Sequence, residues 1–322
     1  MTQPQANTVL VCAPIDEEAR QFLAAHATMR EANPQTKADL MAALDTQVAV
    51  VVMGVRPFVD GETMDCAPGL KVIGRKGVGY DNIDVQAAHQ RGIVVVNTPT
   101  APLEPVAEMT LGLMIALARS FAGGDRITRA GRWDDRRTLI GPELRGKTLG
   151  IVGFGRIGQR VAELVQPLGM RLLYYDVLPQ MSCAERFGAQ RVELPTLFRQ
   201  ADFITVHVPL TEGTHHLIGQ DLLALMKPTA YFINIARGPV VDEQALFQAL
   251  QAKRIAGAAL DVLEQEPPAA DNPLFTLENV LLTPHMGGLS KEGNQAMCMV
   301  VRDIVAVLEG RAPEFPVQCA GA

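Results

Sequence analysis

Three polar segments in the second half of the sequence carry side chains suited to acid–base and anion-binding chemistry, namely Arg237, Glu266 and His285. A guanidinium binds a carboxylate through two parallel hydrogen bonds and polarises a neighbouring carbonyl. A histidine titrates near neutral pH, and a nearby carboxylate stabilises its charged form and raises its pKa. Together the three residues suit hydride transfer to a 2-keto acid: Arg237 binds the carboxylate, His285 donates the proton and Glu266 keeps His285 charged.

Each of these residues also has an ordinary structural explanation. Arg237 could form a surface ion pair, Glu266 could be a solvated loop carboxylate, and His285 could cap a helix or lie in the core. Sequence spacing does not establish that Glu266 and His285 meet in space. From these residues alone the two explanations carry equal weight.

A glycine-rich segment precedes them. Gly153, Gly155 and Gly158 fit the pattern G-x-G-x-x-G, directly after the apolar stretch 149–152 and before the helical stretch 159–168. In that context the first glycine permits a tight turn, the second lets the backbone approach a pyrophosphate, and the third lets helix and strand pack closely. The segment therefore predicts a dinucleotide site.

Asp176 ends the next strand-like run and follows Gly158 by 18 residues, close to the spacing of a ribose-binding acid. A carboxylate there accepts hydrogen bonds from the ribose hydroxyls and repels a 2′-phosphate. The residues that follow, 177–179, contain no arginine to bind such a phosphate. We therefore predict NAD (NADH) as the cofactor, in preference to NADP.

The elements that position these residues follow an alternating pattern of apolar runs and helix-length segments. Continuous apolar runs indicate parallel strands covered by helices on both faces. The three polar segments that carry Arg237, Glu266 and His285 each follow a predicted strand. In a doubly wound sheet ligands bind beyond the carboxyl ends of the strands, so these segments are expected to meet at the ligand site. The predicted strands are 8–13, 48–53, 72–75, 93–97, 148–153, 171–175, 203–208, 231–235, 255–260 and 280–283.

Two longer helices are predicted outside the regular alternation. Apolar residues recur at spacings of three and four along 106–118, which predicts a buried helix that ends at Gly123-Gly124. Residues 290–308 are predicted to form one helix that returns to the first α/β unit. The stretch 106–118 is too short for the roughly 20 residues of a membrane span.

Composition excludes several classes of protein. Of the 322 residues, 48% are hydrophobic and 20% charged, and the net charge is −6, so neither a disordered nor a fibrous protein is indicated. The acidic balance gives no reason to expect a nucleic-acid partner, and no segment indicates a membrane. The five cysteines are widely spaced and the N-terminus does not resemble a signal peptide, so we expect reduced thiols and a cytoplasmic location.

The order of motifs resembles that of the D-isomer-specific 2-hydroxyacid dehydrogenase family, and the phosphoglycerate-dehydrogenase-like subgroup in particular. The resemblance covers nearly the whole chain. It rests on GFGRIG (153–158), Asp176, NIARGPVVDE (234–243), DVLEQEP (261–267) and TPHMGG (283–288), with further similarity at 74–84 and 106–108.

The resemblance implies an α/β fold with two Rossmann-like, doubly wound parallel-sheet domains. A flavodoxin-like substrate-binding domain would comprise 1–101 and 290–322, and an NAD-binding domain 102–289. The substrate would lie between them, with hinges near Pro102 and Ser290. The implied activity is hydride transfer between NAD(H) and a 2-hydroxy acid/2-keto acid pair, as in a hydroxypyruvate or glyoxylate reductase or a phosphoglycerate dehydrogenase.

The resemblance also assigns roles to particular residues. Arg237 would bind substrate, Glu266 would orient His285, and His285 would exchange the proton. The backbone around Val78 and Gly79 would bind the substrate carboxylate. Cofactor contacts are implied at the glycines of the turn and at Arg156, Ile157, Asp176, Val208, Ile235, Ala236, Asp261, Gly287 and Gly288.

Several alternatives stay open. Relatives that act on phosphoglycerate have an arginine where this chain has Gly54, which puts phosphoglycerate itself in doubt as the substrate. Arg56, two residues later, is interpreted as a solvated loop residue in preference to a substrate contact. A second function class is an NAD(H)-sensing protein of the co-repressor type with little turnover. Similarity to formate dehydrogenase is disfavoured because those relatives have glutamine in place of Glu266. The particular 2-hydroxy acid and the direction of the reaction are not specified.

No metal is expected. His207 lies at a strand end, and the adjacent His215 and His216 should point in different directions, with no acidic residue at ligand spacing beside them. Trp133 and Arg136-Arg137 follow the long helix in a predicted arm. Relatives form two-fold dimers through that region, so a homodimer is implied, although solvated surface is an equal alternative.

Overall fold

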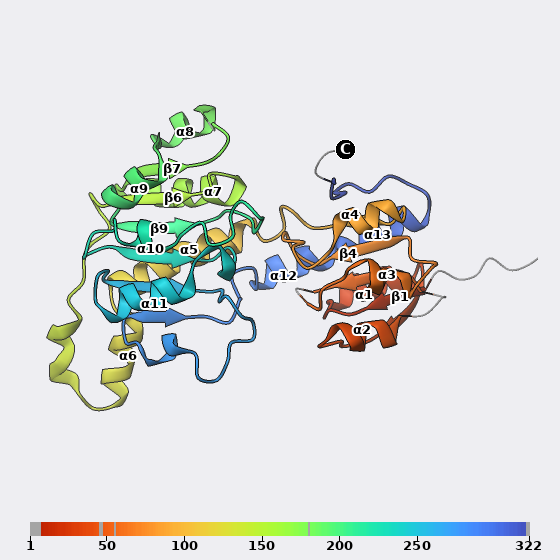
Figure 1. Cartoon of the computed structure of the whole chain (residues 1–322), viewed down its shortest axis with the longest axis horizontal. Helices are drawn as coiled ribbons and strands as arrows, with labels where there is room; N and C mark the ends of the chain where they lie inside the picture. The colour runs from red at the N-terminus through yellow and green to blue at the C-terminus, as the bar shows by residue number, and fades with distance from the viewer. Residues whose placement is uncertain (1–7, 45–47, 55, 180, 320–322) are drawn as a thin grey trace, which may run out of the picture. The chain divides into compact units, whose positions relative to one another are not determined.

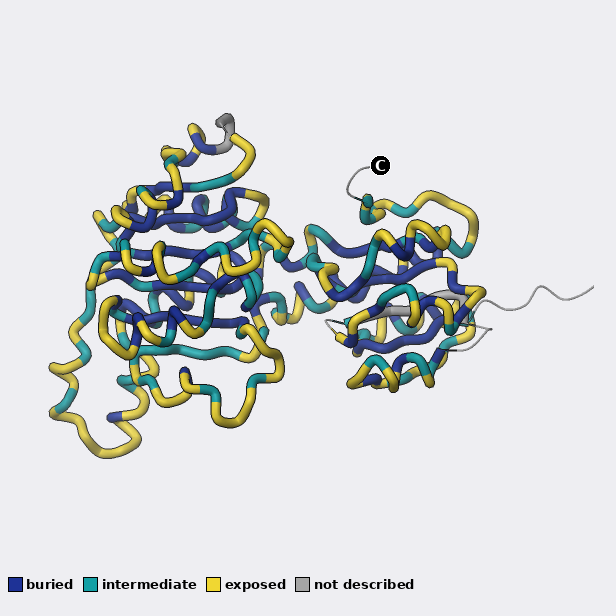
Figure 2. Tube along the Cα trace, in the orientation of Figure 1, coloured by how far each residue is buried: buried dark blue, intermediate teal, exposed yellow. Residues whose placement is uncertain are grey.

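The computed structural model describes residues 8–44, 48–54, 56–179 and 181–319, and the chain divides into two compact units. Unit 1 comprises residues 1–102 and 288–322, and unit 2 comprises residues 103–287. Each unit contains one parallel sheet with helices on both faces, as Figure 1 shows. In both units most of the strands whose burial is described are deeply buried (Figure 2).

The sheet of unit 1 has the strand order β2-β1-β3-β4-β5, which is the flavodoxin-like order that we predict. Its strands are β1 (Thr8–Val11), β2 (Thr28–Glu31), β3 (Val48–Met53), β4 (Val72–Arg75) and β5 (Val94–Val96). Its helices are α1 (Glu17–Ala24), α2 (Lys37–Ala43), α3 (Gly61–Asp65), α4 (Val85–Gln90), α12 (Lys291–Cys298) and α13 (Val300–Leu308).

Side chains of β1 alternate between two apolar cores. Leu10 faces the core under α2, α3 and α4, whereas Val9 and Val11 face the core under α1 and α13. A sheet buried on both faces explains why these strands read as unbroken apolar runs in the sequence.

The sheet of unit 2 has seven strands in the order β12-β11-β10-β9-β6-β7-β8. The order reverses between β6 and β9, and this switch point is where doubly wound sheets bind ligands. The strands are β6 (Thr148–Val152), β7 (Arg171–Tyr175), β8 (Gln190–Arg191), β9 (Phe203–Val206), β10 (Tyr231–Asn234), β11 (Gly257–Leu260) and β12 (Val280–Leu282).

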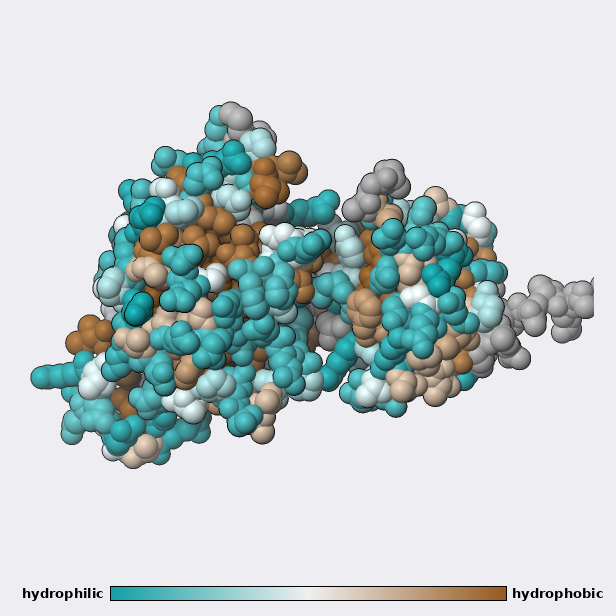
Figure 3. All heavy atoms as spheres, viewed as in Figure 1, coloured by the Kyte–Doolittle hydropathy of each residue, from teal (hydrophilic) through white to brown (hydrophobic). Residues whose placement is uncertain are grey.

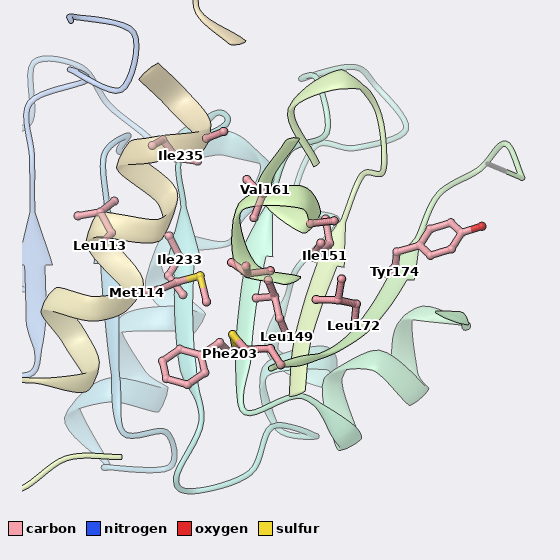
Figure 4. Close-up of a cluster of buried hydrophobic side chains, with 14 of the residues drawn as sticks. Leu113, Met114, Leu149, Ile151, Val161, Leu172, Tyr174, Phe203, Ile233 and Ile235 are labelled. Carbon is pink, nitrogen blue, oxygen red and sulfur yellow. The ribbon is translucent and has the colours of Figure 1, made fainter. Parts of the chain in front are cut away.

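Helices cover both faces of this sheet. They are α5 (Leu103–Ala118), α6 (Phe121–Arg129), α7 (Arg156–Val165), α8 (Met181–Phe187), α9 (Leu194–Gln200), α10 (Gln220–Leu223) and α11 (Glu243–Gln251), with 3-10 helices at Trp133–Leu139, Gln166–Leu168, Gly238–Val240 and Pro273–Thr276. Figure 4 shows Leu113 and Met114 of α5 on the side of Ile233, and Val161 of α7 near Ile151, within one apolar cluster. Truncating such a side chain to alanine typically costs about 2–5 kcal/mol of stability.

The predicted end of the long helix is wrong. Helix α5 ends at Ala118, and Gly123-Gly124 lie inside α6. Ser120 adopts a left-handed backbone with φ of 49°, which breaks the helix five residues early. Gly123 packs closely instead, because a Cβ there would lie 3.1 Å from Leu139 Cδ2 of the following 3-10 helix.

The C-terminal stretch predicted as one helix forms two, α12 and α13, which meet at Met299. Two strands were not predicted. β2 is almost wholly exposed and polar, and β8 has only two residues, so neither has the apolar run by which buried strands are recognised.

Within the described residues, no single helix is long and apolar enough to cross a membrane, and only α5 with α6, bent by 57°, passes that test as a pair. Cys12, Cys66, Cys298 and Cys319 are free thiols, and the Cys183 side chain lies outside the described residues. Burial raises the pKa of the Cys12 thiol to about 12, which makes it a poor nucleophile at neutral pH.

Candidate active site

The glycine-rich turn joins β6 to α7 as predicted. Gly153 has φ of 93°, and its amide donates to the Tyr175 carbonyl at 2.8 Å. A Cβ on Gly153 would lie 2.8 Å from the backbone of His207, and one on Gly158 would lie 2.2 Å from the Gly153 carbonyl oxygen. The first and third glycines are therefore required by close packing, because no side chain fits at either position.

The second glycine leaves room for a ligand. No atom lies within 4 Å of the place where a Cβ on Gly155 would be, and no side chain caps the N-terminus of α7. The open amides at a helix N-terminus, together with the helix dipole, bind phosphate groups. This local geometry fits the pyrophosphate of a dinucleotide, and the exposed Arg156 begins the same helix.

Asp176 lies at the carboxyl end of β7, beside this turn. Its Oδ2 accepts a hydrogen bond from the Phe154 amide at 2.7 Å, and its Oδ1 accepts one from the Leu178 amide at 2.9 Å. The carboxylate therefore has a fixed orientation. The prediction from the sequence overlooked one neighbour: the Arg191 guanidinium on β8 donates to the Asp176 carbonyl oxygen at 2.9 Å, so a cation does lie near this carboxylate.

Glu266 and His285 meet in the structure. Their segments follow the adjacent parallel strands β11 and β12, and Nδ1 of His285 lies 2.6 Å from Oε2 of Glu266. The other carboxylate oxygen of Glu266 accepts from the Leu263 amide at 3.1 Å. About a third of each side chain is exposed, 31% for His285 and 33% for Glu266. With Nδ1 facing the carboxylate, Nε2 is the ring atom available to a ligand.

Arg237 is half-buried and completes the group, because it follows β10, the neighbour of β11. Burial raises the pKa of Glu266, but the hydrogen bond and charge of His285, the hydrogen bond from the Leu263 amide and the charge of Arg237 together outweigh it. The net result is a Glu266 pKa below its ordinary value, so the carboxylate is ionised at neutral pH. The structure thus brings Arg237, Glu266 and His285 together within unit 2.

Asp261 holds the segment that carries His285. This buried carboxylate accepts hydrogen bonds from the Thr283 hydroxyl at 2.6 Å and from the amides of Met286 at 2.9 Å and Gly287 at 2.8 Å. His285 itself has φ of 51°, and its amide donates to the Asp261 carbonyl at 2.8 Å. A left-handed backbone at a histidine persists only where its surroundings dictate it.

Asn234 shapes the segment that carries Arg237 and was not predicted as a site residue. Its side-chain amide donates to the Arg237 carbonyl at 2.9 Å, and its Oδ1 accepts from the Ala236 amide at 3.1 Å. The sequence does contain a signal for this role, because Asn234 is an amide residue at the end of the apolar run Tyr231–Asn234. A buried polar side chain in that position is expected to form hydrogen bonds with its surroundings.

The other predicted cofactor contacts, except Gly288, lie around the same edge of the sheet in unit 2. Ile157 lies in α7, Val208 follows β9, and Ile235 and Ala236 follow β10. A Cβ on Gly287 would lie 3.0 Å from both Asp261 Oδ2 and Ile235 Cδ1, so this glycine permits a close approach. Gly288 belongs to unit 1.

Val78 and Gly79 also belong to unit 1, where they follow β4. Asn97 Nδ2 donates to the Val78 carbonyl at 2.6 Å, and the Gly77 amide donates to the Thr98 hydroxyl at 3.0 Å. Within the described parts of the chain, the amides of Val78 and Gly79 have no acceptor, so they are available to an anion. Arg56 is exposed.

The histidines form no metal centre. Across the described ranges, no group of three or more His, Cys, Asp or Glu side chains could hold a metal ion. The prediction that His215 and His216 point in different directions is wrong: their rings stack with centroids 4.1 Å apart, because His216 has a left-handed φ of 49°.

His207 lies beneath the glycine-rich turn. Its Nε2 is 3.0 Å from the Thr205 hydroxyl, and its Nδ1 is buried without a hydrogen-bond partner. Burial lowers the pKa of His207 from 6.5 to about 3. The imidazole is therefore neutral in the folded protein at neutral pH.

This burial predicts acid sensitivity. Below pH 6.5 the unfolded chain binds a proton at His207 that the folded chain does not bind until about pH 3, so stability falls across that interval. The contribution is on the order of a few kcal/mol. Urea unfolding at pH 7.5 and pH 5.0 should show a smaller difference for His207→Asn than for the unaltered protein. His89→Asn, at an exposed position, is the control, and equal pH dependence of all three proteins would contradict the assignment.

Comparison with known proteins gives a consistent result. Residues 111–287 match the family model for the NAD binding domain of D-isomer specific 2-hydroxyacid dehydrogenases. The chain is 44% identical over 309 residues to the D-3-phosphoglycerate dehydrogenase of Methanocaldococcus jannaschii, covering 95% of this chain and 58% of that protein. It is 45% identical over 260 residues to the glyoxylate reductase of Thermofilum pendens, covering 79% of this chain and 77% of that protein.

The fold is likewise shared. The TT0316 protein of Thermus thermophilus superposes with a TM-score of 0.90 at 36% identity, covering 97% of this chain and all of that one. The chain spans a little over half, 58%, of the M. jannaschii relative's length. On the family model and these identities, the chain belongs to the D-isomer specific 2-hydroxyacid dehydrogenase family.

Proposed function

We propose that this chain is an NAD-dependent D-2-hydroxyacid dehydrogenase that interconverts a 2-keto acid and a 2-hydroxy acid. The observation that carries the proposal is the 2.6 Å contact between His285 Nδ1 and Glu266 Oε2, with the Arg237 charge close enough to lower the Glu266 pKa. An acid, its orienting carboxylate and a carboxylate-binding cation are the groups that reduction of a keto acid requires.

In this proposal unit 2 binds the cofactor and unit 1 contributes to substrate binding. Arg237 of unit 2 binds the substrate carboxylate, and the amides of Val78 and Gly79 are the substrate contacts that we propose for unit 1. When bound, NADH would supply the hydride that the carbonyl carbon accepts. Nε2 of His285 gives its proton to the carbonyl oxygen, and the product is the 2-hydroxy acid. Glu266 stays ionised throughout and holds Nδ1, so the proton leaves from Nε2.

The cofactor contacts predicted at Arg156, Ile157, Val208, Ile235, Ala236, Asp261, Gly287 and Gly288 belong to this proposal. Asp261 would act twice, because its buried carboxylate already orients the His285 segment by three hydrogen bonds. A carboxylate has about four lone-pair sites, so it retains room for one further donor.

The experiment that tests the proposal is NADH oxidation by the purified protein with hydroxypyruvate, glyoxylate, pyruvate, phenylpyruvate and 3-phosphohydroxypyruvate, repeated with NADPH. Rapid turnover of one keto acid supports the proposed dehydrogenase activity, and the keto acid that is accepted indicates how large a side chain the substrate pocket admits. Tight NADH binding with no turnover across the panel contradicts it and favours the NAD(H)-sensing class instead.

Asp176 sets the cofactor preference. We expect Asp176→Ala to raise the Kd for NADH about tenfold, because one or two hydrogen bonds to a charged acceptor are lost. The variant should also have a smaller preference for NADH over NADPH. Arg191 would stay beside residue 176 through the backbone carbonyl, and without the carboxylate its positive charge could attract a 2′-phosphate. Fluorescence titration with both cofactors checks this.

Two matched variants separate the causes. Asp176→Asn keeps an acceptor for the Phe154 amide but removes the charge, so it should improve NADPH binding without loosening the turn. Adding Arg191→Ala to Asp176→Ala should abolish the gain for NADPH. An unchanged NADH/NADPH ratio in all three variants would exclude a cofactor role for Asp176.

We also propose that the protein is a homodimer through an arm formed by α6 and the 3-10 helix Trp133–Leu139. Phe121 of α6, Trp133 of the 3-10 helix and Ile140 just after it are 59%, 65% and 84% exposed, and exposed apolar side chains that form a contiguous patch mark an interface. Apolar atoms interrupt the hydrophilic surface in the region of α6 in Figure 3. Sedimentation should give a dimer, and Trp133→Glu with Ile140→Glu should give a monomer. A monomeric parent protein would exclude the interface.

Free thiols at the four described cysteines agree with a reducing compartment, and we propose the cytoplasm.

A further inference from the structure

The segment that presents Glu266 is poorly supported by its own packing. Residues 264–267 are exposed, whereas Asp261 and Val262 before them are buried. Two side chains outside the candidate active site hydrogen-bond to this segment, and both bind at Glu264, two residues before Glu266. They belong to His216 and Glu243.

The contacts at Glu264 run in both directions. Nε2 of His216 lies 2.7 Å from Glu264 Oε1. The Glu264 amide donates to Glu243 Oε2 at 2.8 Å, and the Glu243 amide donates back to Glu264 Oε2 at 3.4 Å. Asn272 Nδ2 fixes the other oxygen of Glu243 at 2.8 Å. Glu264 is therefore held through both its backbone and its carboxylate.

His216 is itself fastened to the segment that follows Arg237. Its amide donates to the Pro239 carbonyl at 2.8 Å, and Ile218 continues the contact with Val240 at 3.1 Å. The two active-site segments also lie directly against each other, because a Cβ on Gly238 would be 1.9 Å from the Leu263 carbonyl oxygen. His216 thus joins both segments, by its backbone to one and by its ring to the other.

The backbone of His216 is set for this contact. Its φ of 49° is left-handed, a conformation that residues with a Cβ adopt only where the surroundings dictate it. The conformation stacks its ring on that of His215 and directs Nε2 to Glu264.

We propose that His216 is a positioning residue: through Glu264 it fixes segment 262–267 and so holds Glu266 against Nδ1 of His285. The inference rests on the proposed dehydrogenase function. The pair is 39% and 37% exposed, and exposed ion pairs contribute little to global stability. The reaction rate should depend on this ion pair far more than global stability does, because a small displacement of a catalytic group such as Glu266 lowers the rate by a large factor.

The kinetic test uses His216→Ala on the full chain, with the keto acid that the panel identifies. We expect kcat to fall about fivefold while KM for the keto acid and Kd for NADH change less than about twofold, because Arg237 and the cofactor turn keep their own supports. His216→Gln places an amide donor near the position of Nε2 and should restore most of kcat. His89→Ala removes an exposed histidine of unit 1 and should leave kcat unchanged.

A second measurement does not depend on turnover. Hydrogen–deuterium exchange of peptides covering 262–267 should be faster in His216→Ala and in Glu264→Ala than in the parent protein, with no further increase in the double variant. Exchange in β10 and β11 should not change. If no keto acid is turned over, the proposed function fails and exchange alone decides the role of His216.

Unchanged exchange at 262–267 in His216→Ala would overturn the proposal. So would a loss of kcat that His216→Gln does not relieve, or that a drop in Tm fully accounts for, because either result indicates a purely structural role.

Discussion

His285→Ala should lower kcat for reduction of the keto acid by about a thousandfold, within the 10²- to 10⁴-fold range of general acid catalysis. The reason is that no other described side chain stands in the same relation to Glu266 and Arg237, so no proton donor takes the place of Nε2. Because the glycine-rich turn and Asp176 are remote from the substitution, the Kd for NADH should change less than about twofold. Steady-state kinetics and fluorescence titration measure the two quantities.

Glu266→Gln is the matched variant for this experiment. It keeps an oxygen for Nδ1 but removes the charge, so kcat should fall by an intermediate factor of about 10 to 100. His26→Ala, on the surface of unit 1, should have no effect. Retention of more than about a tenth of kcat in His285→Ala, or an equal loss of NADH affinity, would contradict the assigned role.

Each of the three candidate active-site residues could be placed after its strand from the sequence, because each follows an apolar run. In parallel doubly wound sheets the carboxyl ends of all strands lie at one edge, so Arg237, Glu266 and His285 had to share that edge. That Glu266 and His285 touch depends on β11 and β12 being neighbours, which strand patterns alone do not specify. The resemblance to a family supplied that step.

What the pattern could not reveal depends on backbone conformation and on polar contacts within the site. The left-handed turns at Ser120, His216 and His285 occur at residues with no intrinsic preference strong enough to predict them. They determine where α5 ends, where the His216 ring points and how His285 faces Glu266. The hydrogen bonds from the Met286 and Gly287 amides to Asp261 form next to the left-handed turn at His285. The sequence therefore suggested Asp261 as a cofactor contact but not as the residue that orients the His285 segment.

Arg237→Lys should lower kcat/KM for the keto acid by about 10²- to 10³-fold although the positive charge is retained. The Arg237 guanidinium donates to the Ala236 carbonyl at 2.7 Å through Nη1, which fixes its plane. A planar fork binds both carboxylate oxygens at once, whereas an ammonium binds as a point charge. Lysine should still act on the Glu266 pKa through its charge, so the loss isolates the geometry of substrate binding.

Two further proteins make this result decisive. Arg237→Ala should lose more activity than Arg237→Lys and recover part of it when guanidinium ion is added, because the small cation can occupy the vacated space. Arg199→Lys, an exposed position on α9, should behave as the parent protein. Two results would show that Arg237 does not bind the substrate carboxylate. One is turnover of the keto acid at full rate by Arg237→Lys, and the other is a loss of NADH binding as large as the loss of keto acid binding. Either result would remove the carboxylate-binding residue that we propose in unit 2.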